Sequence, residues 1–241
     1  MIKEADFNKA PKNKVPYIEH DGNLLGDSQL IIRYLENTFN VNYMSGLGGG
    51  KNHFIPFAKL SSTEKAQSEL IRILCEHDIY WGILSIKWAG EGGICRTETA
   101  WHNTVENYFG AIPAVIRGVI TSMIRVDVLR DSWGQGLQRH SPEDQLYFMK
   151  RSLETLSVTL GRNTFMLGDS PSECDCIAFG TLDCLLDDSK WPNALTDFIN
   201  DTCPNLVRYH RSIRQSVFED MKLGDKLPPS VTDVKGVFNE H

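Results

Sequence analysis

The pattern of hydrophobic and polar positions changes once along this chain, after Phe39. Before that point, short apolar runs favour strands and one helix. Beyond it, apolar residues recur every three or four positions, as in helices that bury one face. The chain is therefore predicted to be α+β overall and mostly α. Its predicted parts are a partial N-terminal unit at 1–39, a linker at 40–61, a helical domain at 62–221 and a loose tail at 222–241.

The segment at 13–36, NKVPYIEHDGNLLGDSQLIIRYLE, predicts a hairpin followed by a helix. Val15–Glu19 is β-branched and aromatic, which favours a strand. Asp21–Gly22 is typical of a type I′ turn, because both central positions of that turn need φ > 0. Leu24–Leu25 then makes a short return strand. Ser28 is the predicted N-cap of the helix, since apolar residues follow it at helical spacing.

Pro16 and the pair Asp27 and Ser28 are the candidate functional residues of this segment. Proline cannot donate to a sheet ladder, so Pro16 indicates an edge strand or a special geometry such as a cis bond. A helix N-terminus that presents Ser28 and backbone N–H groups is a natural carboxylate site. Asp27 beside it could accept an ammonium group. The two would hold both ends of an amino-acid head group; the alternative is that they only cap the helix.

The helical domain is predicted to begin at Ser62, with Glu64 in the first turn. The buried stripe of this helix is expected to consist of Ala66, Leu70, Leu74, Trp81, Leu84 and Trp88. A second helix is expected over about Pro113 to Trp133, and a fifth from Asn205 to Met221. The sequence shows no internal repeat.

Two further helix starts are marked by the runs SPEDQ and SPSECD. Ser141 is the predicted cap of the third helix, with Pro142 in its first position. Its core stripe is expected to be Leu146, Met149, Leu153, Leu156 and Leu160. Ser172 and Asp175 have the spacing of a capping box, with Asp in place of the usual Glu or Gln. The fourth helix is expected to point Ile177, Leu182 and Leu185 inward.

Charge and hydropathy exclude some classes of partner. The formal net charge is −6, which argues against a nucleic-acid partner, because phosphate binding needs clustered Lys and Arg. No apolar run reaches transmembrane length, and the N-terminus lacks the apolar region of a signal peptide. The glycine-rich run at 46–51 fails the phosphate-loop pattern, so it is interpreted as part of the linker.

The six cysteines, at 75, 95, 174, 176, 184 and 203, show no spacing typical of a disulfide framework. A reducing, cytoplasmic location is therefore expected. Cys174 and Cys176 are predicted to point to different faces of a helix, and a metal site would want more ligands. No metal site and no catalytic residue is predicted.

Several segments, taken in order, resemble the glutathione S-transferase superfamily, and within it the failed axon connections family, which is related to the metaxins. They are APKNKVPYIEHDGNLLGDSQLIIRYLE, EHDIYW, QGLQRHSPEDQ, FMLGDSPSECDCIAFGTL and CPNLVRYHRSIR. The resemblance covers most of the chain from Ala10 to about Met221. It implies a thioredoxin-like N-terminal unit and a helical domain like the C-terminal domain of these transferases.

The resemblance also implies the site. Pro16 would be the cis-proline, Val15 would pair its backbone with the glutathione peptide, and Asp27 and Ser28 would hold the γ-glutamyl end. Only 14 residues precede Val15, whereas the first strand–helix–strand of such a domain needs about 30 residues. The residue that activates the glutathione thiol sits in that part in the family, and no residue here matches it.

Two functional classes follow from the resemblance. The first is an enzyme that conjugates glutathione in detoxification or stress response. The second is a non-catalytic binding or adaptor protein that keeps the fold, with a protein partner or a second copy of the chain. The unmatched thiol activator favours the second class. Glutathione affinity is then expected to be weak, in the millimolar range or worse.

Overall fold

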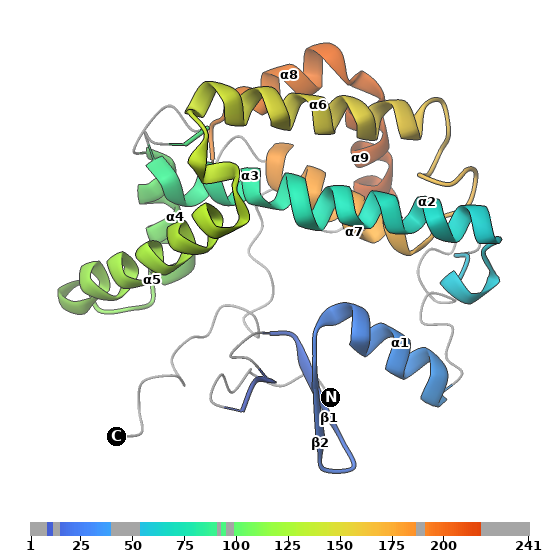
Figure 1. The fold of residues 1–241 in the computed structure, drawn as a ribbon, viewed down its shortest axis with the longest axis horizontal. Helices are drawn as coiled ribbons and strands as arrows, with labels where there is room; N and C mark the ends of the chain where they lie inside the picture. Colours follow the sequence, from blue (N-terminus) through green and yellow to red (C-terminus); the bar gives the residue numbers. More distant parts are fainter. Residues whose placement is uncertain are drawn as a thin grey trace. The chain divides into compact units, whose positions relative to one another are not determined.

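The computed structural model of the chain describes residues 9–11, 15–39, 54–90, 93–94, 99–186 and 191–217. These residues fall into two compact units. Unit 1 holds the described residues up to 39 together with 111–113, and unit 2 holds the others, from 54 to 217. The predicted tail and the glycine-rich run lie outside the described residues. Figure 1 draws the strands and α1 of unit 1 in blue and the helices of unit 2 from cyan to orange.

Unit 1 contains the predicted hairpin and helix. Strands β1 (Tyr17–His20) and β2 (Asn23–Gly26) pair antiparallel, with Tyr17 opposite Gly26 and His20 opposite Asn23. The turn between them has positive φ at both Asp21 (50°) and Gly22 (76°), as a type I′ turn requires. The predicted turn is thereby confirmed. Helix α1 follows at Ser28–Phe39.

The hairpin contacts α1 through His20, the last residue of β1. The ring of His20 lies 2.6 Å from the hydroxyl of Tyr34, measured from Nδ1 to Oη, and edge-on to the ring of Phe39. Ile31 is the buried residue of α1. A two-stranded hairpin is marginal alone in water, and these contacts give it a packed face.

Unit 2 is helical. Its α-helices are α2 (Ser62–Ile73), α3 (Tyr80–Leu84), α4 (Thr99–Phe109), α5 (Ala114–Gln135), α6 (Pro142–Leu160), α7 (Glu173–Leu186), α8 (Ala194–Thr202) and α9 (Pro204–Val217). Short 3₁₀ segments stand at η2 (Phe57–Lys59) and η6 (Leu137–Arg139). Helices α4 and α8 have no counterpart in the sequence prediction. Within the described residues, no helix is both long enough and apolar enough to cross a membrane.

Helices α2 and α3 belong to one continuous helix that contains two π-helical stretches, η3 (Leu74–Ile79) and η4 (Ser85–Ala89). Ser61 and Glu64 form a reciprocal capping box at its start. It ends at Gly90, which has a φ of 62°.

The predicted buried stripe of this helix is wrong in its first half. Ala66 is exposed and Leu70 is 66% exposed. The buried row is instead Ile71, Cys75, Ile79, Ile83 and Ile86. A spacing of four drifts by about 40° per step on an α-helix of 3.6 residues per turn. The π stretches take an extra residue per turn, which keeps this row facing the core.

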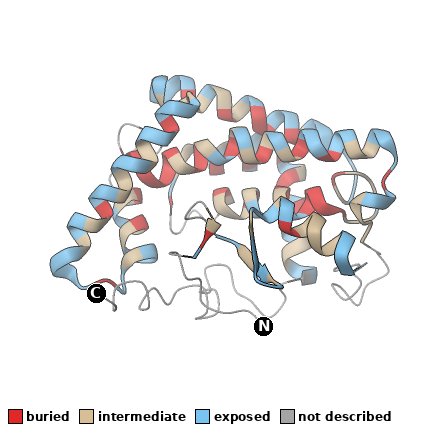
Figure 2. Cartoon of the chain, turned by 60° about the horizontal axis from the view of Figure 1, so that its bottom comes forward, coloured by how far each residue is buried: buried red, intermediate tan, exposed pale blue. Residues whose placement is uncertain are grey.

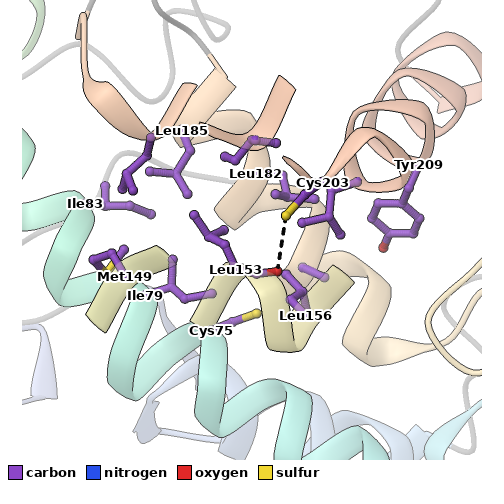
Figure 3. Close-up of a cluster of buried hydrophobic side chains, with 14 of the residues drawn as sticks. Cys75, Ile79, Ile83, Met149, Leu153, Leu156, Leu182, Leu185, Cys203 and Tyr209 are labelled. Carbon is purple, nitrogen blue, oxygen red and sulfur yellow. Dashed lines mark hydrogen bonds between the residues drawn. The ribbon is translucent and has the colours of Figure 1, made fainter. Parts of the chain in front are cut away.

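The core of unit 2 is built from α6, α7 and the buried row of the long helix. The predicted stripe of α6 is confirmed, because Met149, Leu153, Leu156 and Leu160 are all buried. Figure 3 shows Leu153 and Leu156 facing Leu182 and Leu185 of α7, with Cys75 and Ile79 on the other side. In Figure 2, buried residues recur along one face of the long helices while the other face is exposed.

The start of α7 is held by Asp175, as its capping-box spacing predicts. The carboxylate accepts hydrogen bonds from the backbone N–H groups of Ser172 and Met166, each at 2.8 Å. The hydroxyl groups of Ser172 and Tyr209 also donate to it, at 2.9 and 3.0 Å. Cys174 is buried and Cys176 is exposed, so the two thiols face different sides, as predicted.

Candidate functional site

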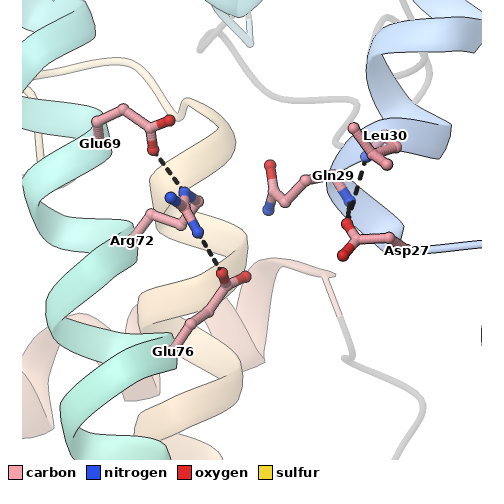
Figure 4. Close-up of polar contacts among 6 residues, drawn as sticks. All are labelled: Asp27, Gln29, Leu30, Glu69, Arg72 and Glu76. Atoms are coloured by element: carbon pink, nitrogen blue, oxygen red, sulfur yellow. Dashed lines mark hydrogen bonds and ion pairs between the residues drawn. The ribbon is translucent and has the colours of Figure 1, made fainter. Parts of the chain in front are cut away.

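The N-terminus of α1 is built by Asp27. Its carbonyl accepts a hydrogen bond from the N–H of Ile31 at 2.9 Å. Its Oδ1 accepts hydrogen bonds from the N–H groups of Gln29, at 3.0 Å, and Leu30, at 3.4 Å (Figure 4). Asp27 is therefore the N-cap, and the prediction that Ser28 caps the helix is wrong. Asp and Ser are equally good caps, and here the chain turns one residue earlier, with Ser28 as the first helical residue.

Asp27 adopts the left-handed backbone region, with φ at 79°. Asp and Asn enter this region more readily than most residues. Asp27 is the single residue between Gly26, which ends β2, and Ser28, which begins α1. Both Asp27 and Ser28 are exposed to solvent.

The other two predicted site residues immediately precede β1. Val15 is 47% exposed, and the Val15–Pro16 peptide bond is cis, as the family resemblance implies. Because Tyr17 pairs with Gly26, the residues just before Tyr17 and just after Gly26 lie at the same end of the hairpin. The structure thus brings Val15, Pro16, Asp27 and Ser28 together at that end.

This end of the hairpin presents both a helix N-terminus, which is partially positive, and the negative carboxylate of Asp27. The first turn of α1 contains no acidic residue, so the positive end of the helix dipole is not neutralised by a carboxylate inside the helix. Both cap hydrogen bonds of Asp27 end on Oδ1; within the described residues, its Oδ2 accepts none. A helix N-terminus suits a carboxylate, and Oδ2 suits an ammonium group.

Four buried or partly buried thiol and phenol groups of unit 2 lie in environments that disfavour their ionisation. Burial raises the pKa of Cys75 and of Cys174 to about 12. Burial also raises the pKa of Tyr80 and, together with Asp175, that of Tyr209. These groups are poor candidates for activating or replacing a thiolate nucleophile.

A shallow groove of about 420 Å³ lies in unit 2 along α8 and α9. Arg208 and Arg211 line it together with Asn200, Pro204, Val207, Ser212 and Gln215. It contains none of the four predicted site residues.

Two family models match the sequence. A model described as glutathione S-transferase N-terminal domain matches residues 2–93, and one described as glutathione S-transferase, C-terminal domain, matches residues 149–213. The first match includes all four residues at the hairpin end. The second includes most of α6, the capped start of α7, and α8.

Bacterial and animal proteins are similar to this sequence over most of the chain. An isoprene-epoxide–glutathione S-transferase from Rhodococcus sp. (strain AD45) is 32% identical over 217 residues, which cover 86% of this chain and 79% of the relative. Failed axon connections from Drosophila melanogaster is 25% identical over 227 residues, covering 88% of this chain and 48% of the relative. The chain therefore spans about half the length of that protein. A metaxin-1 homolog from Caenorhabditis briggsae is 26% identical over 159 residues, covering 65% of this chain and 46% of the relative.

Solved structures share the fold. The beta-etherase LigF from Sphingobium sp. strain SYK-6 superimposes with a TM-score of 0.50 at 15% sequence identity. The match covers 88% of this chain and 80% of LigF.

Proposed function

Because this chain belongs to the glutathione S-transferase family, we propose that it binds glutathione at the hairpin end formed by Val15, Pro16, Asp27 and Ser28. The observation that carries the proposal is the pairing of Tyr17 with Gly26, which places both pairs of residues at one end. The α-carboxylate of the γ-glutamyl group would lie at the N-terminus of α1, and its ammonium group at Asp27. The backbone of Val15 would pair with the peptide of glutathione.

The residues present fit such a ligand. A γ-glutamyl group carries a carboxylate and an ammonium on one carbon, and the site pairs a helix N-terminus with an exposed carboxylate. The cap bonds fix the position of Asp27, so little side-chain freedom is lost on binding. Charged hydrogen bonds contribute about 1.5–3 kcal/mol each, so a few of them give weak affinity, in the millimolar range.

We further propose that the chain acts as a binding or adaptor protein and not as an efficient transferase. Bound glutathione supplies a thiol nucleophile, and conjugation needs a donor that stabilises its thiolate. Within the described residues, each cysteine or tyrosine whose pKa departs from its usual value has it raised. An adaptor role adds a protein partner or a second copy of the chain. The exposed apolar side chains of α5, among them Val115 and Met123, support such a role.

The second candidate is a glutathione-dependent transferase. It is supported by the 32% identity to the isoprene-epoxide–glutathione S-transferase. The chemistry of that relative is conjugation of an epoxide, as its name states. We place either function in the cytoplasm, because the described cysteines are free thiols.

The test separates binding from conjugation. Glutathione binding is measured by calorimetry for the full chain and for Asp27→Asn, which keeps a capping oxygen and removes the charge. We expect Asp27→Asn to weaken binding about tenfold, since one charged contact near 1.4 kcal/mol is lost. Glu19→Ala, on the exposed face of β1, is the control and should bind as the unmodified chain does. Equal affinity for all three chains would overturn the proposed site.

Conjugation of a generic electrophile is then assayed with the same three proteins. Turnover indistinguishable from the uncatalysed reaction supports the binding role. Robust turnover that falls with Asp27→Asn supports the transferase instead, and locates a thiol-activating group within this chain.

A further inference from the structure

A buried lysine lies beside a cysteine in unit 2, far from the hairpin in sequence. Lys87 belongs to the π-helical stretch η4, and only 6% of the residue is exposed. Its Nζ lies 4.1 Å from the centre of a Trp191 ring and donates a hydrogen bond to Tyr108 Oη at 3.0 Å. The same Nζ donates to Cys184 Sγ on α7 at 3.8 Å. Side chains from α4 and α7, together with Trp191 from the loop before α8, thus converge on the ammonium group of η4.

The charge of Lys87 is compensated by aromatic rings and not by a carboxylate of the described residues. Buried lysines are normally paired with a carboxylate. Within the described residues, no carboxylate forms an ion pair with Lys87. The faces of Trp191 and Tyr108, which stack with their ring centres 5.8 Å apart, attract the cation instead. Burial disfavours the charged form, but the negative charge that Cys184 and Tyr108 can carry outweighs it, and the pKa of Lys87 is raised.

Three described cysteines are chemically sheltered. Burial raises the pKa values of all of them: Cys75, Cys174 and Cys203. Each of these side chains is buried, so a reagent in solution has no access to its sulfur. A thiol in such surroundings is inert.

Cys176 and Cys184 are the two cysteines of α7 that are not fully buried, and their neighbours carry charges of opposite sign. Desolvation of its sulfur by the surrounding protein, together with the carboxylates of Asp175 and Glu173, raises the pKa of Cys176 to about 11. Cys184 is half-buried and has the Lys87 ammonium at its sulfur. Negative charge on the sulfur is therefore opposed at Cys176 and attracted at Cys184.

We propose that Cys184 is a modification site of this chain, at which the sulfur held by Lys87 exchanges with small disulfides such as glutathione disulfide. In that step, Cys184 releases its proton to solvent and Sγ bonds to one sulfur of the disulfide. The original S–S bond breaks, and the second sulfur leaves as a thiolate that takes up a proton. The products are a mixed disulfide on Cys184 and one free small thiol, so no other oxidant is required. The nearby ammonium stabilises the negative charge that the sulfurs share in the transition state.

The modification has a structural consequence. A group attached to Cys184 must occupy space beside Lys87, Tyr108 and Trp191, which are in mutual contact. Trp191 also donates from Nε1 to Thr104 at 3.0 Å, which ties this contact to α4. We expect the exchange to change the fluorescence of Trp191 and to lower the melting temperature.

The experiment measures thiol release from an aromatic disulfide, dithionitrobenzoate, by the full-length protein, with the modified peptide identified by mass spectrometry. We expect one fast-reacting thiol per chain, mapped to Cys184. Cys184→Ser should abolish the fast phase and Cys176→Ser, the matched control on the same helix, should keep it. Lys87→Met should slow it by about tenfold or more, and Lys87→Arg should retain most of the rate.

Several outcomes would overturn the proposal. They are a fast phase that maps to Cys176 or Cys95, a fast phase that survives Cys184→Ser, and an unchanged rate in a folded Lys87→Met protein. The peptide map of the unmodified chain decides the matter even where a Lys87 variant does not fold. Glu19→Ala, at an exposed position outside both sites, should leave the rate unchanged. The readout is a mapped thiol and not glutathione affinity, so this proposal and the glutathione site at the hairpin fail independently.

Discussion

Asp183 on α7 and Arg214 on α9 form an ion pair, with 2.8 Å between Oδ1 and Nη1. His210 Nε2 lies 2.8 Å from the same Oδ1. Partial burial works against the ionised carboxylate, but the hydrogen bond from His210 and the charge of Arg214 outweigh it. The pKa of Asp183 is therefore lowered from its usual value of 3.8. This carboxylate joins the last two long helices of unit 2.

The lowered pKa predicts how stability depends on pH. A folded-state pKa below the unfolded value gives stability that is present above the unfolded pKa and lost as pH falls through the folded one. Asp183→Asn should lower the free energy of unfolding by about 1 kcal/mol at neutral pH, because the pair is partly exposed and screened. The difference should begin to shrink as pH falls below about 4 and should vanish once pH is below the lowered pKa of the folded state. Denaturant titrations at several pH values check this, with the exposed Asp201→Asn as control; a difference that grows in acid would contradict it.

Asp175→Ala should be among the most destabilising single changes in unit 2. It leaves two backbone N–H groups and two hydroxyls without their acceptor in a buried position. We expect a loss of about 3 kcal/mol or more, since hydrogen bonds to charged groups contribute about 1.5–3 kcal/mol each. Chemical unfolding measures it. Asp169→Ala, an exposed carboxylate in the preceding loop, should change stability little, and equal effects of the two would refute the capping role.

Gly82 lets α3 approach α6. A Cβ at this position would lie 2.1 Å from Sδ of Met149, a residue that is 1% exposed. Gly82→Ala should therefore destabilise the protein by about 1–3 kcal/mol through overpacking. In a Met149→Ala background the same change should be neutral or stabilising.

Gly180 on α7 is the matched control, because a Cβ there would meet nothing within 4 Å. Gly180→Ala should stabilise the protein by about 0.5–1 kcal/mol through helix propensity. Thermal unfolding of the unmodified chain and the four variants tests both positions. A neutral Gly82→Ala in the unmodified background would contradict the overpacking, because it would show that Met149 moves aside at no cost.

Unit 2 should fold without unit 1. Its core is formed by side chains of its own helices. Near its N-terminal end, the backbone N–H of Ile55 donates a hydrogen bond to the carbonyl of Pro171 at 2.8 Å. A fragment of residues 54–221 is therefore expected to unfold cooperatively, with a melting temperature close to that of the same unit in the full chain. A fragment beginning at 62 lacks the Ile55 contact and the buried Leu60 and should be less stable. Calorimetry compares the two, and non-cooperative melting of the longer fragment would disprove independent folding.

Features fixed by neighbouring residues could be predicted from the sequence. The Asp21–Gly22 turn, the Ser141 cap and the core stripe of α6 follow from local backbone preferences and helical spacing. The buried face of α2 could not be predicted, because both Leu70 and Ile71 begin apolar rows, and the π stretches decide between them. The predicted cap of α1 is wrong by one residue for a similar reason, because Asp27 and Ser28 are equally suitable caps in the sequence.

The two candidate sites also differ in how far they could be predicted from the sequence. Val15, Pro16, Asp27 and Ser28 were found because they lie within one short segment with a family pattern. Their binding of glutathione stays a prediction. The contact between Lys87 and Cys184 joins residues far apart in sequence, and neither residue carries a local signal. The tertiary fold of unit 2 brings them together.

The antiparallel register of the hairpin sets the relative position of the two pairs of residues in the proposed glutathione site. The two pairs of site residues meet because equal numbers of residues run from the turn to Tyr17 and to Gly26. One residue inserted beside Gly22 would change no side chain at the site. It would, however, slide one strand past the other by one position and turn its side chains to the opposite face. The pair Val15 and Pro16 would then no longer lie opposite the pair Asp27 and Ser28, and one ligand could not contact both pairs. The number of residues in the turn is therefore as much a determinant of binding as the identity of Asp27.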